Sequence, residues 1–320
     1  MYKEGEFKIM NKKVLGIVLA VIVVLGGGYF AFQGINNGVI APQGDLEVTH
    51  ELGTVLVPRN PQNIAVFDYG TLDSLDALGV EVAGVAQSSI PAHLAKFSAS
   101  SYTDLGTLHE PNFETLAALQ PDIILISGRQ RSHYEALSEI APTIYFGIDN
   151  DDYIGSFNNN VRTLGEIFNK TTEVEAIIAD IESSVNQINV AAKATSAKAL
   201  ILLTNSGEIS AYGPSSRFGI IHNTLGIEPV DANIETATHG QSVSFEYVVE
   251  KNPDYIFVVD RSAVVGAGND TKIFENDLMK NVTAYQENQI IFLDQGAWYI
   301  ASGGIESTQL MMAEIEAVFN

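Results

Sequence analysis

The sequence predicts an α/β protein in which two similar α/β lobes are joined by a single long interlobe helix, with the ligand cleft between them. A helix–turn–strand pattern occurs twice, and an uninterrupted amphipathic helix lies between the two copies. Short apolar runs alternate with helical patterns in both halves. An internal repeat constrains architecture strongly, and this one is too widely spaced for a solenoid.

The repeated pattern has four members whose spacing is identical in both copies. They are Glu114, Pro121, Asp122 and Arg129 in the first copy and Glu246, Pro253, Asp254 and Arg261 in the second. Each copy is typical of a short helix, a Pro-Asp turn, a buried strand and an arginine where the strand ends. Open α/β sheets bind ligands at the carboxyl ends of their strands, so the repeat predicts one arginine from each lobe in a shared cleft.

The N-terminus carries a predicted membrane segment, assigned to residues 1–32. Lys12–Lys13 precede the uncharged apolar run 14–32, which approaches the roughly 20 residues needed to span a bilayer core. Bulky side chains follow where small residues would mark a cleavage site, which favours an uncleaved signal-anchor over a cleaved signal peptide. The two lysines would be cytoplasmic and the rest of the chain outside. Met10 is an alternative start to Met1.

Residues 33–45 are a polar, glycine-rich linker, and residues 46–170 are the predicted N-terminal lobe. Alternating residues indicate an opening hairpin, and short apolar runs indicate strands with helices between them. Apart from the first repeat copy, the expected elements are a hairpin over 46–57, strands at 64–67, 80–85 and 143–146, and helices near 72–78 and 132–140.

The interlobe helix is predicted over residues 171–194. Its apolar residues follow helical spacing, no Gly or Pro interrupts it, and Thr172 with Glu175 would form a capping box. At 1.5 Å per residue it would measure about 35 Å and allow only limited hinge motion. The C-terminal lobe is predicted over 195–320. Its clearest elements are strands at 199–203 and 290–293 and a final helix at 306–319.

The composition argues against several functional classes. A net charge of −22 opposes binding to nucleic acid, whose phosphates need a basic surface. The absence of cysteine excludes disulfides, thiolate metal sites, cysteine nucleophiles and lipid-modified cysteine. No Walker A or G-x-S-x-G motif is present, and the histidines lack metal-binding spacing, so no dedicated zinc or manganese site is expected.

Several longer motifs resemble those of a known family. They are the segments 57–70, 111–114, 127–130, 211–221, 238–240, 244–246, 258–261 and 298–303, together with the long helix. Over residues 46–320 the chain resembles the substrate-binding proteins of ABC importers for iron–siderophores and vitamin B12. The resemblance is closest to binders of catechol-type siderophores, including petrobactin and enterobactin-like fragments.

The resemblance implies an extracytoplasmic protein, tethered by its N-terminal segment, that binds a ferric catecholate siderophore. The chain would be a monomer and would deliver this ligand to an ABC permease dimer with its ATPase. It would not be an enzyme and would hold no intrinsic cofactor, since the Fe(III)-siderophore is its ligand.

Three arginines are the main candidates for ligand contacts. The resemblance implies that Arg129, Arg217 and Arg261 surround the catecholate oxygens, which are anionic and suit the planar donor fork of a guanidinium. The alternative for each is a surface salt bridge. Arg131 is expected to be a surface residue.

His239 and Tyr299 are candidate direct Fe(III) ligands by the same resemblance. Imidazole and phenolate both suit ferric iron, and a tetradentate bis-catecholate leaves two coordination positions open. The alternative is that these side chains only hydrogen-bond to or stack on a hexadentate chelate.

Glu114 and Glu246 begin the two repeated helices, where the helix dipole stabilises an acidic side chain. The resemblance implies that one glutamate per lobe contacts arginines of the permease dimer, whose symmetry matches the repeat. The alternative is a capping role alone.

Three other kinds of function stay open at this point. A receptor for haem, cobalamin or a hydroxamate siderophore would need less positive charge than the three arginines provide. A membrane-anchored metal-dependent hydrolase would need a clustered acid/base or metal set, which the sequence does not show, and a surface adhesin would give the arginines no role.

Overall fold

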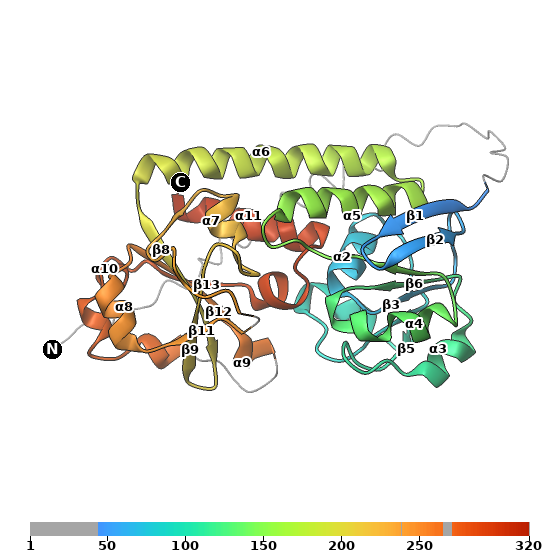
Figure 1. The fold of residues 1–320 in the computed structure, drawn as a ribbon, viewed down its shortest axis with the longest axis horizontal. Helices are drawn as coiled ribbons and strands as arrows, with labels where there is room; N and C mark the ends of the chain where they lie inside the picture. The colour runs from blue at the N-terminus through green and yellow to red at the C-terminus, as the bar shows by residue number, and fades with distance from the viewer. Residues whose placement is uncertain (1–43, 238, 265–270, 320) are drawn as a thin grey trace. The chain divides into compact units, whose positions relative to one another are not determined.

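Residues 44–320 form one compact unit. The computed structural model describes residues 44–237, 239–264 and 271–319 (Figure 1). The predicted membrane segment and nearly all of the linker lie outside these residues. Among the residues described, no helix is long and apolar enough to cross a membrane.

The first lobe is built on a five-stranded sheet in which all neighbouring strands are parallel. Its order is β5-β4-β3-β6-β7, formed by β3 (Ile64–Val66), β4 (Gly84–Val85), β5 (Thr103–Asp104), β6 (Ile123–Ile126) and β7 (Thr143–Tyr145). The helices of this lobe are α2 (Tyr69–Ala77), η1 (Ala92–Ser98), α3 (Phe113–Leu119), η2 (Gly128–His133), α4 (Tyr134–Ser138) and α5 (Tyr153–Ile167). The predicted hairpin is confirmed as the antiparallel pair β1 (Leu46–His50) and β2 (Gly53–Val57).

The strand predicted at 80–85 is shorter in the structure, because its first residues complete the turn that follows α2. The Val80 amide donates to the Leu75 carbonyl at 2.8 Å, and Gly79 has the left-handed φ of 68° that this turn needs. Only Gly84–Val85 joins the sheet.

The second lobe is built on a six-stranded mixed sheet. Its path is β11-β9-β8-β12-β13 with β10 beside β8, formed by β8 (Lys198–Asn205), β9 (Glu208–Tyr212), β10 (Glu228–Pro229), β11 (Gln241–Val243), β12 (Tyr255–Asp260) and β13 (Ile290–Leu293). Strands β8, β12 and β13 are parallel, whereas β9 is antiparallel to its neighbours. The smaller helices are α7 (Ile220–Asn223), α8 (Phe245–Lys251), α9 (Arg261–Val264), η3 (Thr271–Phe274), η4 (Met279–Asn281) and α10 (Thr283–Gln286).

The sequence repeat is a structural repeat. Helices α3 and α8 occupy corresponding positions, and each ends at a residue with left-handed φ, 52° at Gln120 and 43° at Asn252. The following Pro disfavours continuation of the helix. The aspartates of both Pro-Asp turns then accept backbone amides that lead into a neighbouring strand: Asp122 from Asn63 and Asp254 from Lys198, both at 2.8 Å.

The interlobe helix is α6 (Thr171–Thr195). Its buried stripe includes Val174, Ile178 and Ile181, and it packs against α5 of the first lobe and against the C-terminal helix α11 (Ile305–Phe319) (Figure 1). The predicted capping box of Thr172 and Glu175 is wrong. The N-cap is Lys170, without a side-chain hydrogen bond, and Glu175 instead binds Arg162 of α5 at 2.7 Å.

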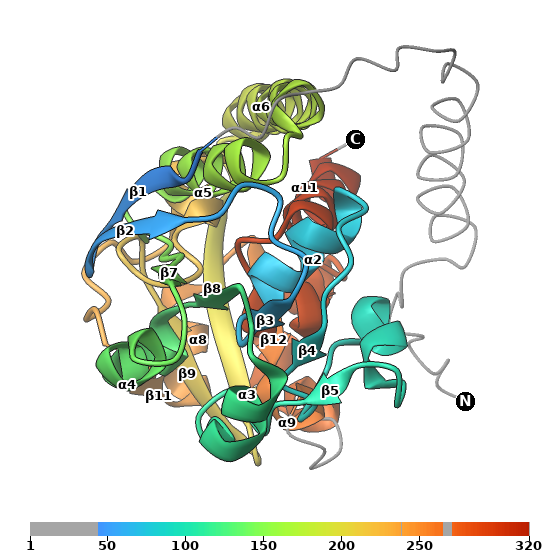
Figure 2. The same ribbon diagram turned by 90° about the vertical axis from the view of Figure 1, so that its right-hand side faces the viewer.

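Helix α11 follows the last strand of the second lobe but begins on the first lobe, where it packs against α2 (Figure 2). The buried carboxylate of Asp73, in α2, accepts the amides of Glu306 and Ser307 at 2.7 and 2.8 Å. A carboxylate at this end of a helix satisfies open N–H groups and complements the helix dipole. The chain therefore passes between the lobes again after α6.

Candidate ligand-binding cleft

A cavity of about 470 Å³ lies between the carboxyl ends of strands from both lobes. This volume falls in the range of small-molecule sites. The first lobe contributes residues that follow β3, β6 and β7, and the second contributes the turn before α7 and the segment after β13. Its polar lining residues include Asp68, Thr71, Ser74, Ser127, Arg129, Tyr145, Asn150, Asn160, Ser215, Ser216, Arg217, Thr236, Tyr299 and Ser302.

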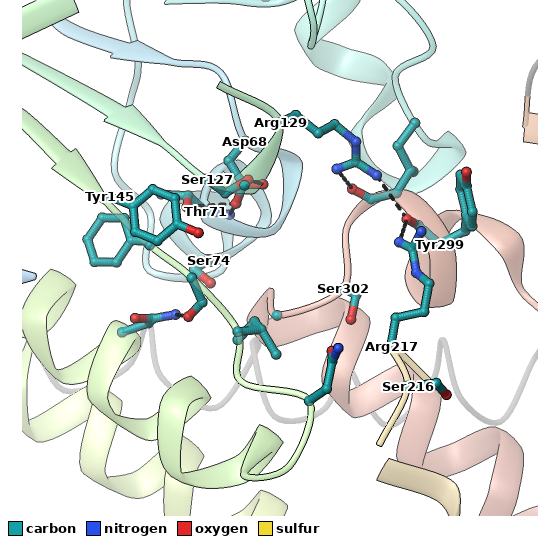
Figure 3. Close-up of a pocket in the computed structure, with 18 of the residues that line it drawn as sticks. Asp68, Thr71, Ser74, Ser127, Arg129, Tyr145, Ser216, Arg217, Tyr299 and Ser302 are labelled. Carbon is teal, nitrogen blue, oxygen red and sulfur yellow. Dashed lines mark hydrogen bonds between the residues drawn. The ribbon is translucent and has the colours of Figure 1, made fainter. Parts of the chain in front are cut away.

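Tyr299 is the residue on which the predicted arginines converge. Its carbonyl oxygen accepts hydrogen bonds from Arg129 Nη2 at 3.1 Å and from Arg217 Nη2 at 2.6 Å (Figure 3). The Arg217 guanidinium also stacks over the Tyr299 ring, 4.2 Å from its centroid. Arg261 donates from Nε to the phenol oxygen at 3.0 Å. Residues from four separate parts of the sequence thus form one cluster.

The backbone that carries Tyr299 is a single turn of π-helix, η5 (Gly296–Ile300). Such turns often occur at functional sites, because they alter the backbone hydrogen bonds of a helix. Here the turn offers the carbonyls of Tyr299 and Ile300 to Arg129, at 3.1 and 3.5 Å. The backbone of η5 therefore takes part in the site together with its side chains.

The cluster has an excess of positive charge. Among the described residues, none of the three arginines forms a salt bridge with a carboxylate, and the buried Nε of Arg217 has no hydrogen-bond partner. Burial lowers the pKa of Arg217, and the charge of Arg129 lowers it further. Buried charges without counterions are unfavourable, so the arrangement suits a ligand that brings negative oxygens.

The other predicted residues are placed less centrally. Arg261 is absent from the cavity lining but contacts Tyr299 and also donates to Asn205 Oδ1 at 3.0 Å. His239 is exposed in a turn and does not line the cavity, although Thr236 and Ala237 of the same loop do. The structure therefore brings the three arginines and Tyr299 together and leaves His239 at the edge.

Arg131 is exposed, as expected, and forms a salt bridge with Glu51 at 2.7 Å. Its guanidinium also lies over the ring of Tyr145, 5.3 Å from the centroid. Glu114 and Glu246 are exposed in the first turns of α3 and α8. A hydrogen bond from Ser244 lowers the pKa of Glu246, so this side chain is ionised at neutral pH.

Sequence reasoning missed several polar residues of the cleft. Asp68, Ser127 and Tyr145 lie at the ends of three parallel strands of the first lobe. The rule that ligands bind at the carboxyl ends of such strands could have identified all three from the predicted strands at 64–67 and 143–146 and from the first repeat copy. Within the described part of the chain, no cluster of three or more His, Asp or Glu side chains could hold a metal ion.

Comparisons with known proteins agree with this geometry. The periplasmic binding protein family matches residues 64–297. The petrobactin-binding protein YclQ of Bacillus subtilis is 41% identical over 94% of this chain and 96% of its own length. The ferric-anguibactin-binding protein FatB of Vibrio anguillarum is 34% identical, with coverage of 84% and 85%.

Solved structures give the same result. The crystal structure of YclQ superposes with a TM-score of 0.85 at 42% identity, covering 87% of this chain and 99% of that one. The periplasmic catecholate-siderophore binding protein VctP of Vibrio cholerae has a TM-score of 0.82 at 35% identity, with coverage of 85% and 99%. Similarity at this level extends over both lobes and the helix that joins them.

Proposed function

The chain belongs to the periplasmic binding protein family, and from this premise we propose that it binds a ferric catecholate siderophore outside the cytoplasm and delivers it to an ABC permease. Proteins of this family bind substrates for transport and do not catalyse reactions, so the chain is not an enzyme. The ferric siderophore is its transported ligand and not a cofactor.

One observation carries the proposal: three guanidinium groups converge on Tyr299 beside the cavity, and none of them has a carboxylate partner within residues 44–237, 239–264 and 271–319. Ferric catecholates carry negative charge on their oxygens, and charge-assisted hydrogen bonds from arginine are among the strongest in proteins. Haem, cobalamin and hydroxamate chelates need less positive charge. The cluster therefore favours the catecholate over these alternatives.

Trp298 provides the test, because it is the chain's single tryptophan and is the neighbour of Tyr299. We expect its fluorescence to be quenched by an iron(III) complex of 3,4-dihydroxybenzoate, and much less by haem, cobalamin or a ferric hydroxamate. A Trp298→Phe variant gives the residual signal for correction of ligand absorbance. Quenching by cobalamin or haem with none by any catecholate would refute the proposal.

We further propose that His239 and Tyr299 complete the coordination of iron when the catecholate is tetradentate. Tyr299 supports this because it lines the cavity, and His239 because its loop reaches the cavity through Thr236 and Ala237. With a bis-catecholate, Tyr299→Phe and His239→Ala should each shift the ligand-to-metal charge-transfer band. With a hexadentate tris-catecholate neither variant should change the spectrum. Unchanged spectra with both chelates would exclude direct coordination.

Glu114 and Glu246 are proposed as the contacts for the permease. Each is exposed in the first turn of a repeated helix, one per lobe. This placement suits a partner with two similar halves. The two glutamates should therefore affect transport without affecting ligand affinity.

A further inference from the structure

Glu314 lies behind the ligand cleft, on the face of α11 that meets the end of β13 and the η5 turn. Its Oε2 accepts the indole N–H of Trp298 at 2.7 Å. Its Oε1 accepts the backbone amide of Asp294 at 3.0 Å. One carboxyl group therefore joins three elements, α11, the end of β13 and η5.

The two residues bound by Glu314, Asp294 and Trp298, also form hydrogen bonds within the backbone of the η5 turn. The Asp294 carboxylate accepts the Ala297 amide at 2.8 Å, and the Asp294 carbonyl accepts the Trp298 amide at 3.0 Å. Trp298 is 1% exposed, so its indole has little freedom to move. The next residue is Tyr299, whose carbonyl, ring and hydroxyl are each contacted by an arginine.

We propose that Glu314 is a positioning residue of the siderophore site: by holding Trp298 and Asp294 it fixes the η5 turn that presents Tyr299 to Arg129, Arg217 and Arg261. The experiments on ligand affinity rest on the proposed function, whereas the experiment on the ligand-free protein does not. Glu314 does not line the cavity, so it acts on the ligand through other residues. Buried hydrogen bonds that fix the orientation of site residues are a common means of preorganisation.

The charge state of Glu314 offers a readout of this contact. Burial, together with the nearby charge of Asp294, raises the pKa of Glu314 to about 7. Asp294 is the charged group that acts on it directly, and Asp294 in turn acts on His93. Near neutral pH the indole N–H of Trp298 therefore faces a carboxyl group that gains or loses its proton.

The first experiment follows the emission of Trp298 from pH 5 to 9 in the ligand-free protein. We expect a transition near pH 7 in the wild type and none in Glu314→Gln. Glu306→Gln is the matched control, because Glu306 lies on the same helix and burial together with the charge of Asp73 raises its pKa to about 7 as well. The indole N–H of Trp298 is accepted by Glu314. The transition should persist in this control. A transition that survives Glu314→Gln, or disappears in Glu306→Gln, overturns the assignment.

The second experiment measures affinity for iron(III)–3,4-dihydroxybenzoate at pH 6. We expect Glu314→Ala to bind about tenfold more weakly, as for the loss of a hydrogen bond to a charged or buried group. Glu314→Gln keeps an acceptor for the indole and should restore most of the affinity. If both variants bind like the wild type, Glu314 does not position the site.

A double variant tests whether Glu314 acts through the arginine cluster. If it does, the loss in Glu314→Ala/Arg217→Gln is smaller than the product of the two single losses, because both changes disturb the same contact with Tyr299. Independent, multiplicative losses contradict the proposal. A wild type that binds no catecholate would refute the proposed function, while the emission titration would still test the contact between Glu314 and Trp298.

Discussion

Asp73 is the residue that fixes α11 to the first lobe. It is fully buried, accepts two backbone amides and the Ser307 hydroxyl of α11, and lies 3.1 Å from His93 Nε2. Burial alone would lower the pKa of His93, but the hydrogen bond and charge of Asp73 raise it overall. The stability that His93 gains from this contact is present below its unfolded pKa and is lost as pH rises through the folded one.

Replacement of Asp73 by Asn should therefore destabilise the protein, and more at pH 6 than at pH 8. The expected loss at pH 6 is about 2–3 kcal/mol in the free energy of unfolding, because hydrogen bonds to a charged group are lost. Urea unfolding at the two pH values measures it. Asp76→Asn is the control, since Asp76 binds the exposed Lys96. A loss that is equal at both pH values would show that His93 is not coupled to Asp73.

Arg217 destabilises the free protein, because it is largely buried and has no carboxylate partner in the part of the chain that the structure describes. Arg217→Gln should weaken binding of the ferric catecholate by about 2–5 kcal/mol, the loss typical when one partner of a buried charge pair is truncated. The free energy of unfolding should not fall. Titration and urea unfolding check both parts, with Arg131→Gln as the matched surface arginine. Equal effects on binding in the two variants would contradict the assignment of the cluster.

At the scale of elements, the repeated helices α3 and α8 present equivalent acidic side chains to solvent. Glu114→Lys and Glu246→Lys should each reduce uptake of iron-55 siderophore by cells at least tenfold, because like charges would face each other at the permease. Affinity for the ligand should be unchanged. Glu135→Lys is the control, because Glu135 is also exposed in the first turn of a helix, α4. Uptake that is normal in both repeat variants would rule out this docking site.

The regular elements could be predicted from the sequence because local signals determine them. The repeat copies, the hairpin, the long helix and the strand at 290–293 carry clear periodicity or turn residues, and all are confirmed. The capping box failed since a tertiary contact with Arg162 engages Glu175. The π-turn of η5 has no such local pattern, because it depends on contacts of Asp294 and Trp298 with a helix that comes later in the sequence.

For the candidate site, too, the features that the sequence could not predict are those that depend on tertiary contacts. The strand ends predicted Arg129 and Arg261 in the cleft, and the family motifs added Arg217 and Tyr299. Of these four residues, Arg261 does not line the cavity and reaches it only through its contact with Tyr299. Sequence spacing could not show that all three arginines contact Tyr299, or that the Tyr299 carbonyl is one of the shared acceptors. Convergence of this type depends on how the two lobes pack.

For the whole molecule, the buried acids predict a pH dependence of stability. Burial raises the pKa of both Glu306 and Glu314 to about 7. For an acid whose folded pKa lies above its unfolded value, the folded state binds more protons in between, so stability falls as pH rises through that range. His93 acts in the same direction.

We therefore expect the free energy of unfolding to decrease by about 1–2 kcal/mol between pH 6 and pH 8, a figure discounted for the partial exposure of Glu306. Urea titrations at several pH values measure the slope. The double variant Glu306→Gln/Glu314→Gln should flatten it. If the free energy of unfolding depends on pH as strongly in this variant as in the wild type, the effect comes from other sources, such as the large net negative charge.

The segment from Tyr299 to Gly304 has a mechanical consequence. It leaves the second lobe at η5, and it is held on the first lobe where Tyr153 binds the Gly303 amide at 2.8 Å and Asp73 binds the start of α11. Any rotation of one lobe against the other must change the backbone of this short segment, which begins at Tyr299. Ligand binding and lobe opening therefore depend on the same few backbone torsions. Opening of the lobes would itself weaken the binding of the ligand.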